Sequence, residues 1–316
     1  MLIKNTFSFI ENSVISYLGS KFFIRFLPLL LVLSTLRVQV DAQSLNPVSK
    51  EDVSFTSEGV VLVGTIYKPK YSSAAVVVVH GSGQEPRMNG FAEILSKEGI
   101  TVLTYDKRGV GKSGGIYAGP EVGTNNIDSV NINLLAKDAS AAVNILKQHY
   151  KNMPIGILGF SQAGWIIPIA ANQNPLVKFM VMFSCPTITT LEQLRFQFYT
   201  AGRPDFWDNH TESDVRQHIK NDPDKYQFTS TDPKVSLGTL SIPGLWLFGG
   251  KDIQIPVKMC IDQINVLKAQ GKSFEYTFFP ALGHSTAFAN DKTPVDISIQ
   301  WIKQKAMGFK KNSGKK

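Results

Sequence analysis

Short apolar runs alternate with longer amphipathic stretches along most of this chain, and this alternation is the feature that most restricts how it can fold. Runs of about four to eight apolar residues are typical of strands buried on both faces of a sheet, whereas apolar residues at helix spacing are typical of covering helices. The predicted strands are residues 58–67, 74–79, 100–105, 155–159, 177–183, 244–248 and 274–279. The predicted helices are residues 88–97, 128–149, 163–171, 257–268 and 294–305. The alternation predicts an α/β fold whose parallel sheet carries helices on both faces.

One stretch, from about residue 186 to residue 240, interrupts this pattern. It is polar and charged, and it is also rich in aromatic residues, among them Phe196, Phe198, Tyr199, Phe206 and Trp207. Because it is too long for an ordinary connection, we expect it to form an inserted cap over one edge of the sheet.

The net charge of +8 is concentrated at the two ends of the chain. Residues 1–42 carry a net two of these charges and the last seven residues carry four, which leaves about two on the rest. We therefore interpret residues 309–316 as a basic, flexible and solvated tail, with weak contact to nucleic acid or to an anionic surface as the alternative. For the body of the protein we expect no nucleic-acid partner. With 43% hydrophobic and 18% charged residues, the composition is that of an ordinary globular chain.

The N-terminus resembles an export signal. Arg25 precedes the apolar run 26–33, and the small-residue pattern that ends at Ala42 predicts cleavage there and a mature chain of residues 43–316. The apolar run is short for a membrane span, and Arg37 closes it. An uncleaved anchor and a start codon placed too early stay open as alternatives, because the region before Arg25 is long and contains Glu11. We expect a secreted or periplasmic protein with no stable membrane span after cleavage.

The segment Gly159-Phe160-Ser161-Gln162-Ala163-Gly164 lies between a predicted buried strand and a short predicted helix. A Ser on such a sharp turn is held with its hydroxyl exposed above the sheet, and its neighbours must be small because the backbone is crowded. The usual pattern is G-x-S-x-G, and Ala163 stands at its last position here. Since Ala is also small, we interpret Ser161 as a candidate nucleophile. A Gly-rich strand–helix connection with an incidental Ser is the alternative.

Two further residues fit the needs of a serine nucleophile. Its hydroxyl is unreactive at neutral pH without a base, and the base needs a third group that fixes its tautomer. Asp252 and His284 each follow a predicted strand, so they fall at the same sheet edge as Ser161, where open α/β sheets bind ligands. The chain order Ser, Asp, His is the order that this architecture uses. We expect His284 to act as general base and Asp252 to orient it.

The segment His80-Gly81-Ser82-Gly83 follows another predicted buried strand. Acyl transfer develops negative charge on the substrate carbonyl oxygen, and fixed backbone N–H groups can stabilise that charge. We expect one donor to be the N–H of Gln162 and the other to be the N–H of Ser82 or Gly83. His80 is expected to hold the loop in shape, and Gly81 to let its backbone approach the oxygen.

From about residue 52 to its last helix, the chain resembles the α/β-hydrolases, in particular serine esterases, lipases and serine aminopeptidase-like members. The loop at His80, the elbow at Ser161, the turn at Asp252 and the Gly283-His284 pair stand in the family's order. The segment from Asp106 to Ser113 is also similar to the D-x-R-G-x-G-x-S pattern of these members. The resemblance implies an eight-stranded, mostly parallel sheet and hydrolysis of an ester, thioester or amide without a cofactor.

Two other motifs overlap that last segment. Residues 109–114 match the dinucleotide fingerprint G-x-G-x-x-G, and residues 111–113 are similar to the end of a phosphate-binding loop. Neither interpretation is favoured, since the residues that follow cannot open a helix and Asp106 replaces the first required glycine of the phosphate loop. Asp106 and Arg108 are expected to form a structural pair beneath the site.

The chain has two cysteines, Cys185 and Cys260. We interpret both as small buried hydrophobes, with a disulfide between them left open. The spacing of His, Cys and carboxylates predicts no metal site.

The sequence thus favours a serine hydrolase that cleaves small acyl esters, with the cap aromatics lining the substrate pocket. Amide or peptide cleavage is the second hypothesis. It would need a carboxylate cluster to hold a free amino terminus, for which the cap offers Glu192, Asp205, Asp208, Glu212 and Asp214. A catalytically silent binding protein on the same scaffold is the third.

Overall fold

The structure is a computed structural model that describes residues 46–119 and 126–313. The predicted export signal and the predicted cleavage after Ala42 lie outside the described residues.

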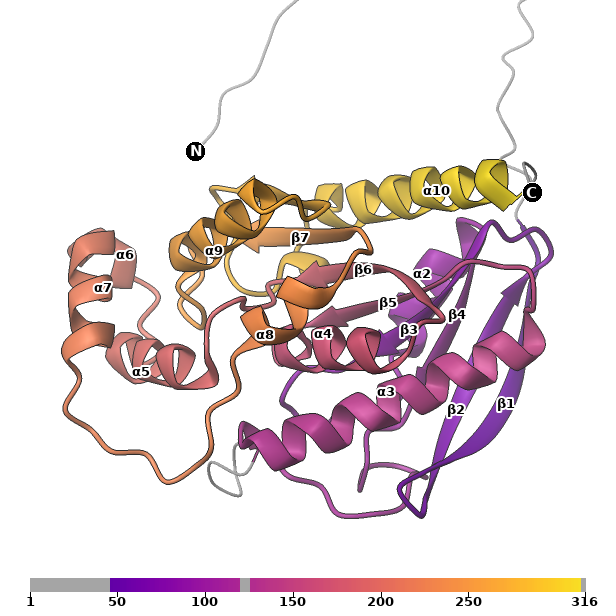
Figure 1. The fold of residues 1–316 in the computed structure, drawn as a ribbon, viewed down its shortest axis with the longest axis horizontal. Helices are drawn as coiled ribbons and strands as arrows, with labels where there is room; N and C mark the ends of the chain where they lie inside the picture. Colours follow the sequence, from indigo (N-terminus) through magenta and orange to yellow (C-terminus); the bar gives the residue numbers. More distant parts are fainter. Residues whose placement is uncertain (1–45, 120–125, 314–316) are drawn as a thin grey trace, which may run out of the picture. The chain divides into compact units, whose positions relative to one another are not determined.

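Eight strands form one sheet in the order β1-β2-β4-β3-β5-β6-β7-β8 (Figure 1). They are β1 (Val48–Ser57), β2 (Val60–Pro69), β3 (Ala74–Val79), β4 (Ile100–Tyr105), β5 (Ile155–Phe160), β6 (Val177–Phe183), β7 (Gly244–Gly249) and β8 (Phe274–Phe279). β2 pairs antiparallel with both β1 and β4, and all other neighbours pair in parallel. The expected eight-stranded, mostly parallel sheet is therefore confirmed.

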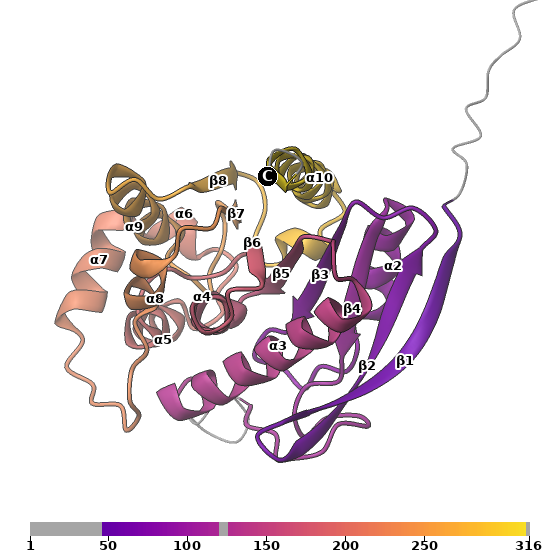
Figure 2. The same cartoon turned by 45° about the vertical axis from the view of Figure 1, so that its right-hand side comes forward.

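Helices cover both faces of this sheet (Figures 1 and 2). One face packs against α3 (Ser129–His149), α4 (Ala163–Gln173), α8 (Pro233–Thr239) and α9 (Val257–Ala269). The other packs against α2 (Asn89–Lys97) and α10 (Thr293–Ser313). In β3, Val77 joins the first core, whereas Val76 and Val78 join the second. Such strands read as unbroken apolar runs because every side chain along them is buried.

The first strand was not predicted, and the predicted strand 58–67 starts inside a turn. β1 and β2 form a hairpin whose turn residues, Glu58 and Gly59, have φ angles of 48° and 74°. β1 has the sequence VSKEDVSFTS and is exposed along much of its length. An edge strand of this kind lacks the apolar run that identifies the central strands.

The final helix is longer than predicted. α10 begins at Thr293 and ends at Ser313, eight residues beyond the predicted end at residue 305. The predicted basic tail, residues 309–316, therefore lies partly in this helix and partly outside the described residues.

The insertion at residues 186–240 contains α5 (Thr190–Thr200), α6 (Phe206–Asn209), α7 (Glu212–Asn221) and α8. Its first three helices lie beside α9, beyond the arrowhead of β7 (Figure 1). They bury a small core of their own, which consists of Phe196, Phe206, Val215 and Ile219. Two capping boxes begin the longer helices, one at Thr189 and Glu192 and the other at Thr211 and Asp214. The insertion is thus an ordered helical unit.

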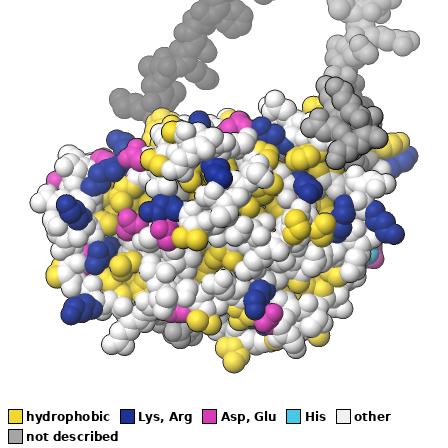
Figure 3. All heavy atoms as spheres, in the orientation of Figure 1, with side chains coloured by type: hydrophobic (Ala, Val, Ile, Leu, Met, Phe, Trp, Pro, Cys, Tyr) yellow, Lys and Arg dark blue, Asp and Glu magenta, His cyan; other side chains and the backbone are white. Residues whose placement is uncertain are grey.

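Basic side chains are spread over the face of the molecule seen in Figure 3, with acidic side chains among them. Within the described ranges, no helix has both the length and the apolar character needed to cross a membrane.

Candidate active site

The connection between β5 and α4 is a sharp turn with Ser161 at its tip. Ser161 has a φ of 49°, in the left-handed region that non-glycine residues rarely adopt. Its N–H donates to the carbonyl of Phe183 (3.1 Å), and its own carbonyl accepts from the N–H of Gly164 (2.9 Å). A Cβ on Gly159 would lie 2.5 Å from the Cβ of Ala163, so the turn closes only with glycine there. Backbone strain of this kind is characteristic of functional residues.

Asp252 and His284 lie on the loops that follow β7 and β8. Nδ1 of His284 lies 2.7 Å from Oδ2 of Asp252, and the carboxylate is buried. The other carboxylate oxygen, Oδ1, accepts from the N–H groups of Gln254 (2.7 Å) and Ile255 (3.0 Å). An ionised carboxylate in this position accepts the proton of Nδ1, which leaves Nε2 of His284 as the proton acceptor.

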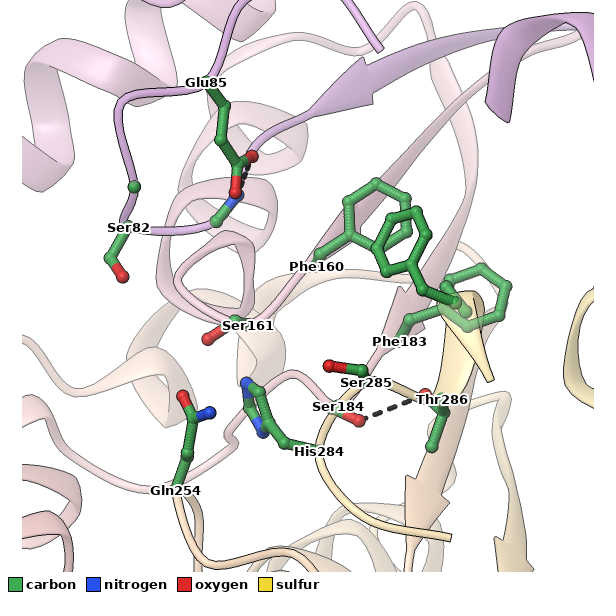
Figure 4. A pocket seen from close by; sticks show the side chains of 14 residues that line it. Ser82, Glu85, Phe160, Ser161, Phe183, Ser184, Gln254, His284, Ser285 and Thr286 are labelled. Atoms are coloured by element: carbon green, nitrogen blue, oxygen red, sulfur yellow. Dashed lines mark hydrogen bonds between the residues drawn. The ribbon is translucent and has the colours of Figure 1, made fainter. Parts of the chain in front are cut away.

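Ser161 and His284 share one pocket of about 230 Å³. In Figure 4 the imidazole ring points toward Ser161, and Phe160 and Phe183 form an aromatic wall on another side. The structure therefore brings together the three residues that the sequence singled out, although they come from three separate strand ends.

The buried ammonium group of Lys107 binds the loop after β3. Nζ of Lys107 donates to the carbonyls of Gly81 (2.7 Å) and Gly83 (3.3 Å) and to Oε1 of Gln162 (3.1 Å). Across a trans peptide the carbonyl and the following N–H point in opposite directions, so the N–H of Ser82 faces away from Lys107. The N–H of Gln162 lies at the N-terminus of α4, where helices leave such groups without an internal partner. Both proposed donor positions are thus available to a substrate oxygen.

Two more side chains fix the same loop. The carboxylate of Glu85 accepts from the N–H of Gly81 (3.2 Å), and the hydroxyl of Tyr117 donates to the carbonyl of Ser82 (3.0 Å). Glu85 also lines the pocket of Ser161. Sequence reasoning missed the roles of Lys107, Glu85 and Tyr117, because each depends on contacts with residues that are close only in the folded chain.

His80 is buried and lies outside the pocket of Ser161. Its ring packs edge-on against Tyr105 with 5.1 Å between ring centroids. Burial, together with the charge of Lys107, lowers the pKa of His80 from 6.5 to about 3. His80 is therefore neutral at physiological pH and lies in the packing beneath the loop.

The expected pair of Asp106 and Arg108 is wrong. Arg108 forms a buried bidentate ion pair with Asp138 of α3, with 2.9 Å between its Nε and Oδ2 of Asp138. Asp106 instead accepts from the N–H of Arg87 (2.9 Å) and the N–H of Lys112 (2.9 Å). Asp106 thereby stabilises the glycine-rich turn at residues 109–114. The next helix, α3, starts only at Ser129.

The expectation that the cap aromatics line the substrate pocket is also wrong. Phe196 and Phe206 are buried in the core of the insertion, and Phe198 stacks on Tyr226 at the surface. Trp207 instead donates from Nε1 to the backbone carbonyl of Asp252 (2.7 Å). The apolar side chains that line the pocket of Ser161 are Phe160, Phe183, Ala287 and Phe288.

The acidic residues of the insertion do not gather at the pocket. Glu192 and Asp214 are occupied in the two capping boxes, and Glu212 pairs with Arg216 (2.9 Å). Among the residues that the structure describes, Glu85 is the carboxylate that lines the pocket of Ser161.

Cys185 and Cys260 are both free and buried, so the disulfide alternative is excluded. Burial raises the pKa of the Cys260 thiol to about 12, and burial also raises the pKa of the Cys185 thiol well above its usual value. Both behave as apolar residues. Over the described ranges, His, Cys, Asp and Glu side chains form no group of three suited to a metal ion.

Comparisons with known proteins point in one direction. The family described as serine aminopeptidase, S33, matches residues 70–246. The chain is 28% identical over 305 residues to Esterase EstD of Thermotoga maritima, which covers 82% of this chain and 69% of that protein. It is 23% identical over 188 residues to a monoglyceride lipase of Rattus norvegicus, which covers 57% of this chain and 58% of that protein. A solved esterase of Pyrococcus furiosus superposes with a TM-score of 0.58 at 20% identity, over 84% of this chain and 93% of the esterase.

Proposed function

Because this chain belongs to the serine aminopeptidase S33 family of α/β-hydrolases, it is a serine hydrolase, and we propose that it cleaves carboxylic esters at Ser161. The observation that carries the proposal is the geometry of one pocket. It holds a strained serine turn and the ring of His284, whose Nδ1 lies 2.7 Å from a buried carboxylate oxygen of Asp252. The esterase and lipase relatives support ester substrates over other acyl compounds.

In the proposed mechanism, Oγ of Ser161 attacks the ester carbonyl carbon while Nε2 of His284 takes the hydroxyl proton. The carbonyl oxygen becomes an oxyanion, which the N–H of Gln162 and the N–H of Ser82 or Gly83 stabilise. His284 then gives its proton to the leaving alcohol, and the acyl group remains on Ser161.

Water completes the cycle. His284 removes a proton from water, and the resulting hydroxide attacks the carbonyl carbon of the acyl-enzyme. The bond to Oγ of Ser161 then breaks as His284 returns the proton to Oγ, which releases a carboxylic acid and free Ser161. Throughout, Asp252 stabilises the charged imidazole without accepting its proton. No redox step or cofactor enters this sequence.

The test compares the protein with its Ser161→Ala variant on p-nitrophenyl butyrate and on labelling by a fluorophosphonate probe. We expect turnover and labelling in the first and neither in the second. A folded protein that neither labels nor hydrolyses esters would contradict the proposal.

A second candidate, cleavage of an amide next to a free amine, is favoured by one observation. Glu85 places a carboxylate in the pocket, where it could bind an ammonium group. Aminoacyl p-nitroanilides tested beside the esters decide between the two, since an amidase of this kind would turn over the free amine and reject its acetylated form.

A further inference from the structure

The pocket of Ser161 adjoins a second hollow, because the two have lining residues in common. This groove has a volume of about 620 Å³ and shares Glu85, Ala287 and Phe288 with the catalytic pocket. The catalytic pocket alone, at about 230 Å³, is smaller than the range of roughly 300–1,000 Å³ in which proteins enclose small ligands. The groove alone falls within that range, so the space for most of a substrate lies there.

Apolar side chains line much of the groove, and the polar residues Arg87, Asn89 and Lys292 also line it. Met88, Phe91 and Ile94 line it from the side of α2, and Phe288 lines it from the 3₁₀ turn Thr286–Phe288. Ile94 is 45% exposed and Phe288 is 53% exposed, so both present apolar surface that an acyl chain would bury. The ring of Phe91 supports Phe288 from beneath, with 5.8 Å between the ring centroids.

The three substituents of the ester carbonyl carbon must point in different directions, and this geometry assigns one of them to the groove. The carbonyl oxygen lies toward the N–H of Gln162, and the leaving oxygen must lie near Nε2 of His284, which protonates it. The remaining substituent is the acyl chain. Figure 4 shows Phe160 and Phe183 on a side of Ser161 separate from the loop of Ser82 and from the ring of His284. Phe288 packs on Phe160 with 5.1 Å between ring centroids and continues that wall into the groove.

The hollow beside the insertion is separate from the catalytic pocket. It is lined by Trp207, Val257 and Phe278 together with His210, Glu212 and Lys258, and it shares no lining residue with the catalytic pocket. The aromatic side chains at the core of the insertion are already packed against one another.

We propose that the groove between α2 and Phe288 binds the acyl chain of the substrate, so the protein prefers esters of medium-chain or longer fatty acids. The inference rests on the proposed esterase function and adds the chemical class of the acyl group.

The experiment measures kcat/KM over p-nitrophenyl esters from acetate to decanoate, in the wild-type protein and in two pairs of variants. Ile94→Gln removes apolar wall, and Val266→Gln is its control, since Val266 is 51% exposed on α9 and lies outside both hollows. Gly90→Leu adds bulk to the groove, and Gly238→Leu is its control on α8. At both glycines an added Cβ meets open space.

We expect kcat/KM of the wild-type protein to rise with chain length, by up to about fourfold for each methylene that becomes buried. Ile94→Gln and Gly90→Leu should lower kcat/KM for decanoate by about tenfold and leave butyrate within about twofold, whereas both controls behave as wild type. Equal losses for butyrate and decanoate, or a profile unchanged in both groove variants, would overturn the proposal.

A second series keeps the acyl group as acetate and lengthens the alcohol. A chain-length effect that appears only there, and that Ile94→Gln removes, overturns the acyl assignment. Failure of the esterase function itself gives a different result, because the wild-type protein would then hydrolyse no ester of either series.

Discussion

Lys107 shows how much of a catalytic site can depend on one residue that does not touch the substrate. Its ammonium group is buried and binds two backbone carbonyls of the loop after β3 and the side chain of Gln162. These contacts connect the two segments that supply the proposed oxyanion donors. Lys107 is therefore a positioning residue.

Replacing Lys107 with Met should lower kcat/KM for p-nitrophenyl butyrate by about 10- to 100-fold, mainly through kcat, because misplaced oxyanion donors weaken transition-state binding. The unsatisfied carbonyls should also lower the free energy of unfolding by about 1–3 kcal/mol. Steady-state kinetics and urea unfolding measure the two effects. Lys112→Met, an exposed lysine nearby, is the control. A loss of stability with unchanged kcat would show that Lys107 is purely structural.

The buried His80 predicts a dependence of stability on pH. Its folded pKa of about 3 lies below its ordinary value of 6.5, so between these values the unfolded chain binds a proton that the folded protein does not. The free energy of unfolding therefore falls as the pH drops below 6.5, because His80 becomes protonated in the unfolded chain first. The expected loss between pH 6.5 and pH 4.5 is about 2–3 kcal/mol.

Urea unfolding at pH 6.5 and at pH 4.5 tests this for the wild-type protein and for His80→Gln. The variant should show a smaller loss between the two pH values, whereas His149→Gln, at an exposed histidine, should match the wild type. Equal losses in wild type and His80→Gln would show that His80 is not the group responsible.

At the scale of single elements, apolar runs and apolar residues at helix spacing could be predicted from the sequence, whereas the polar edge strand β1 could not. The strands from β3 to β8 are apolar enough to be recognised, and residues at their carboxyl ends could be predicted to meet because parallel strands end at one edge. β1 was not predicted, because most of its residues are polar and few of them are buried. The partner of Arg108 could not be predicted either, since Asp138 lies on a helix and only the fold brings it near.

The helices of the insertion were missed for a related reason. They are short and polar, and their apolar residues face a small local core rather than the sheet. Aromatic composition alone does not distinguish a substrate pocket from such a core, and this led to the wrong expectation for Phe196 and Phe206.

The turn between β5 and α4 gives a prediction at this scale. Gly159→Ala should lower the free energy of unfolding by about 1–3 kcal/mol, because its Cβ would lie 2.5 Å from Cβ of Ala163. Adding Ala163→Gly to that variant removes the partner of the clash and should restore part of the loss. Contacts with Val79 and Ile167 remain, so recovery is incomplete. Urea unfolding of both single variants and the double variant measures the coupling, and strictly additive losses would contradict it.

For the molecule as a whole, the two ends of the chain carry most of the net charge. We propose that the N-terminal end, residues 1–42, directs export. Intact-mass measurement of the protein recovered from cells that export it should give a chain that begins at Gln43. A mass that retains residues 1–42 favours the uncleaved anchor. Replacing Leu30 with Arg interrupts the apolar run and should keep the protein at full length if the run directs export.

The order of strands in the sheet also governs when this protein acquires activity. Ser161 follows a strand near the middle of the sheet, whereas Asp252 and His284 follow the last two strands to be synthesised. A growing chain can form the serine turn early, yet it stays inert until β8 has paired with β7 near the end of translation. Hydrolysis at Ser161 therefore requires the last strand of the sheet to be in place.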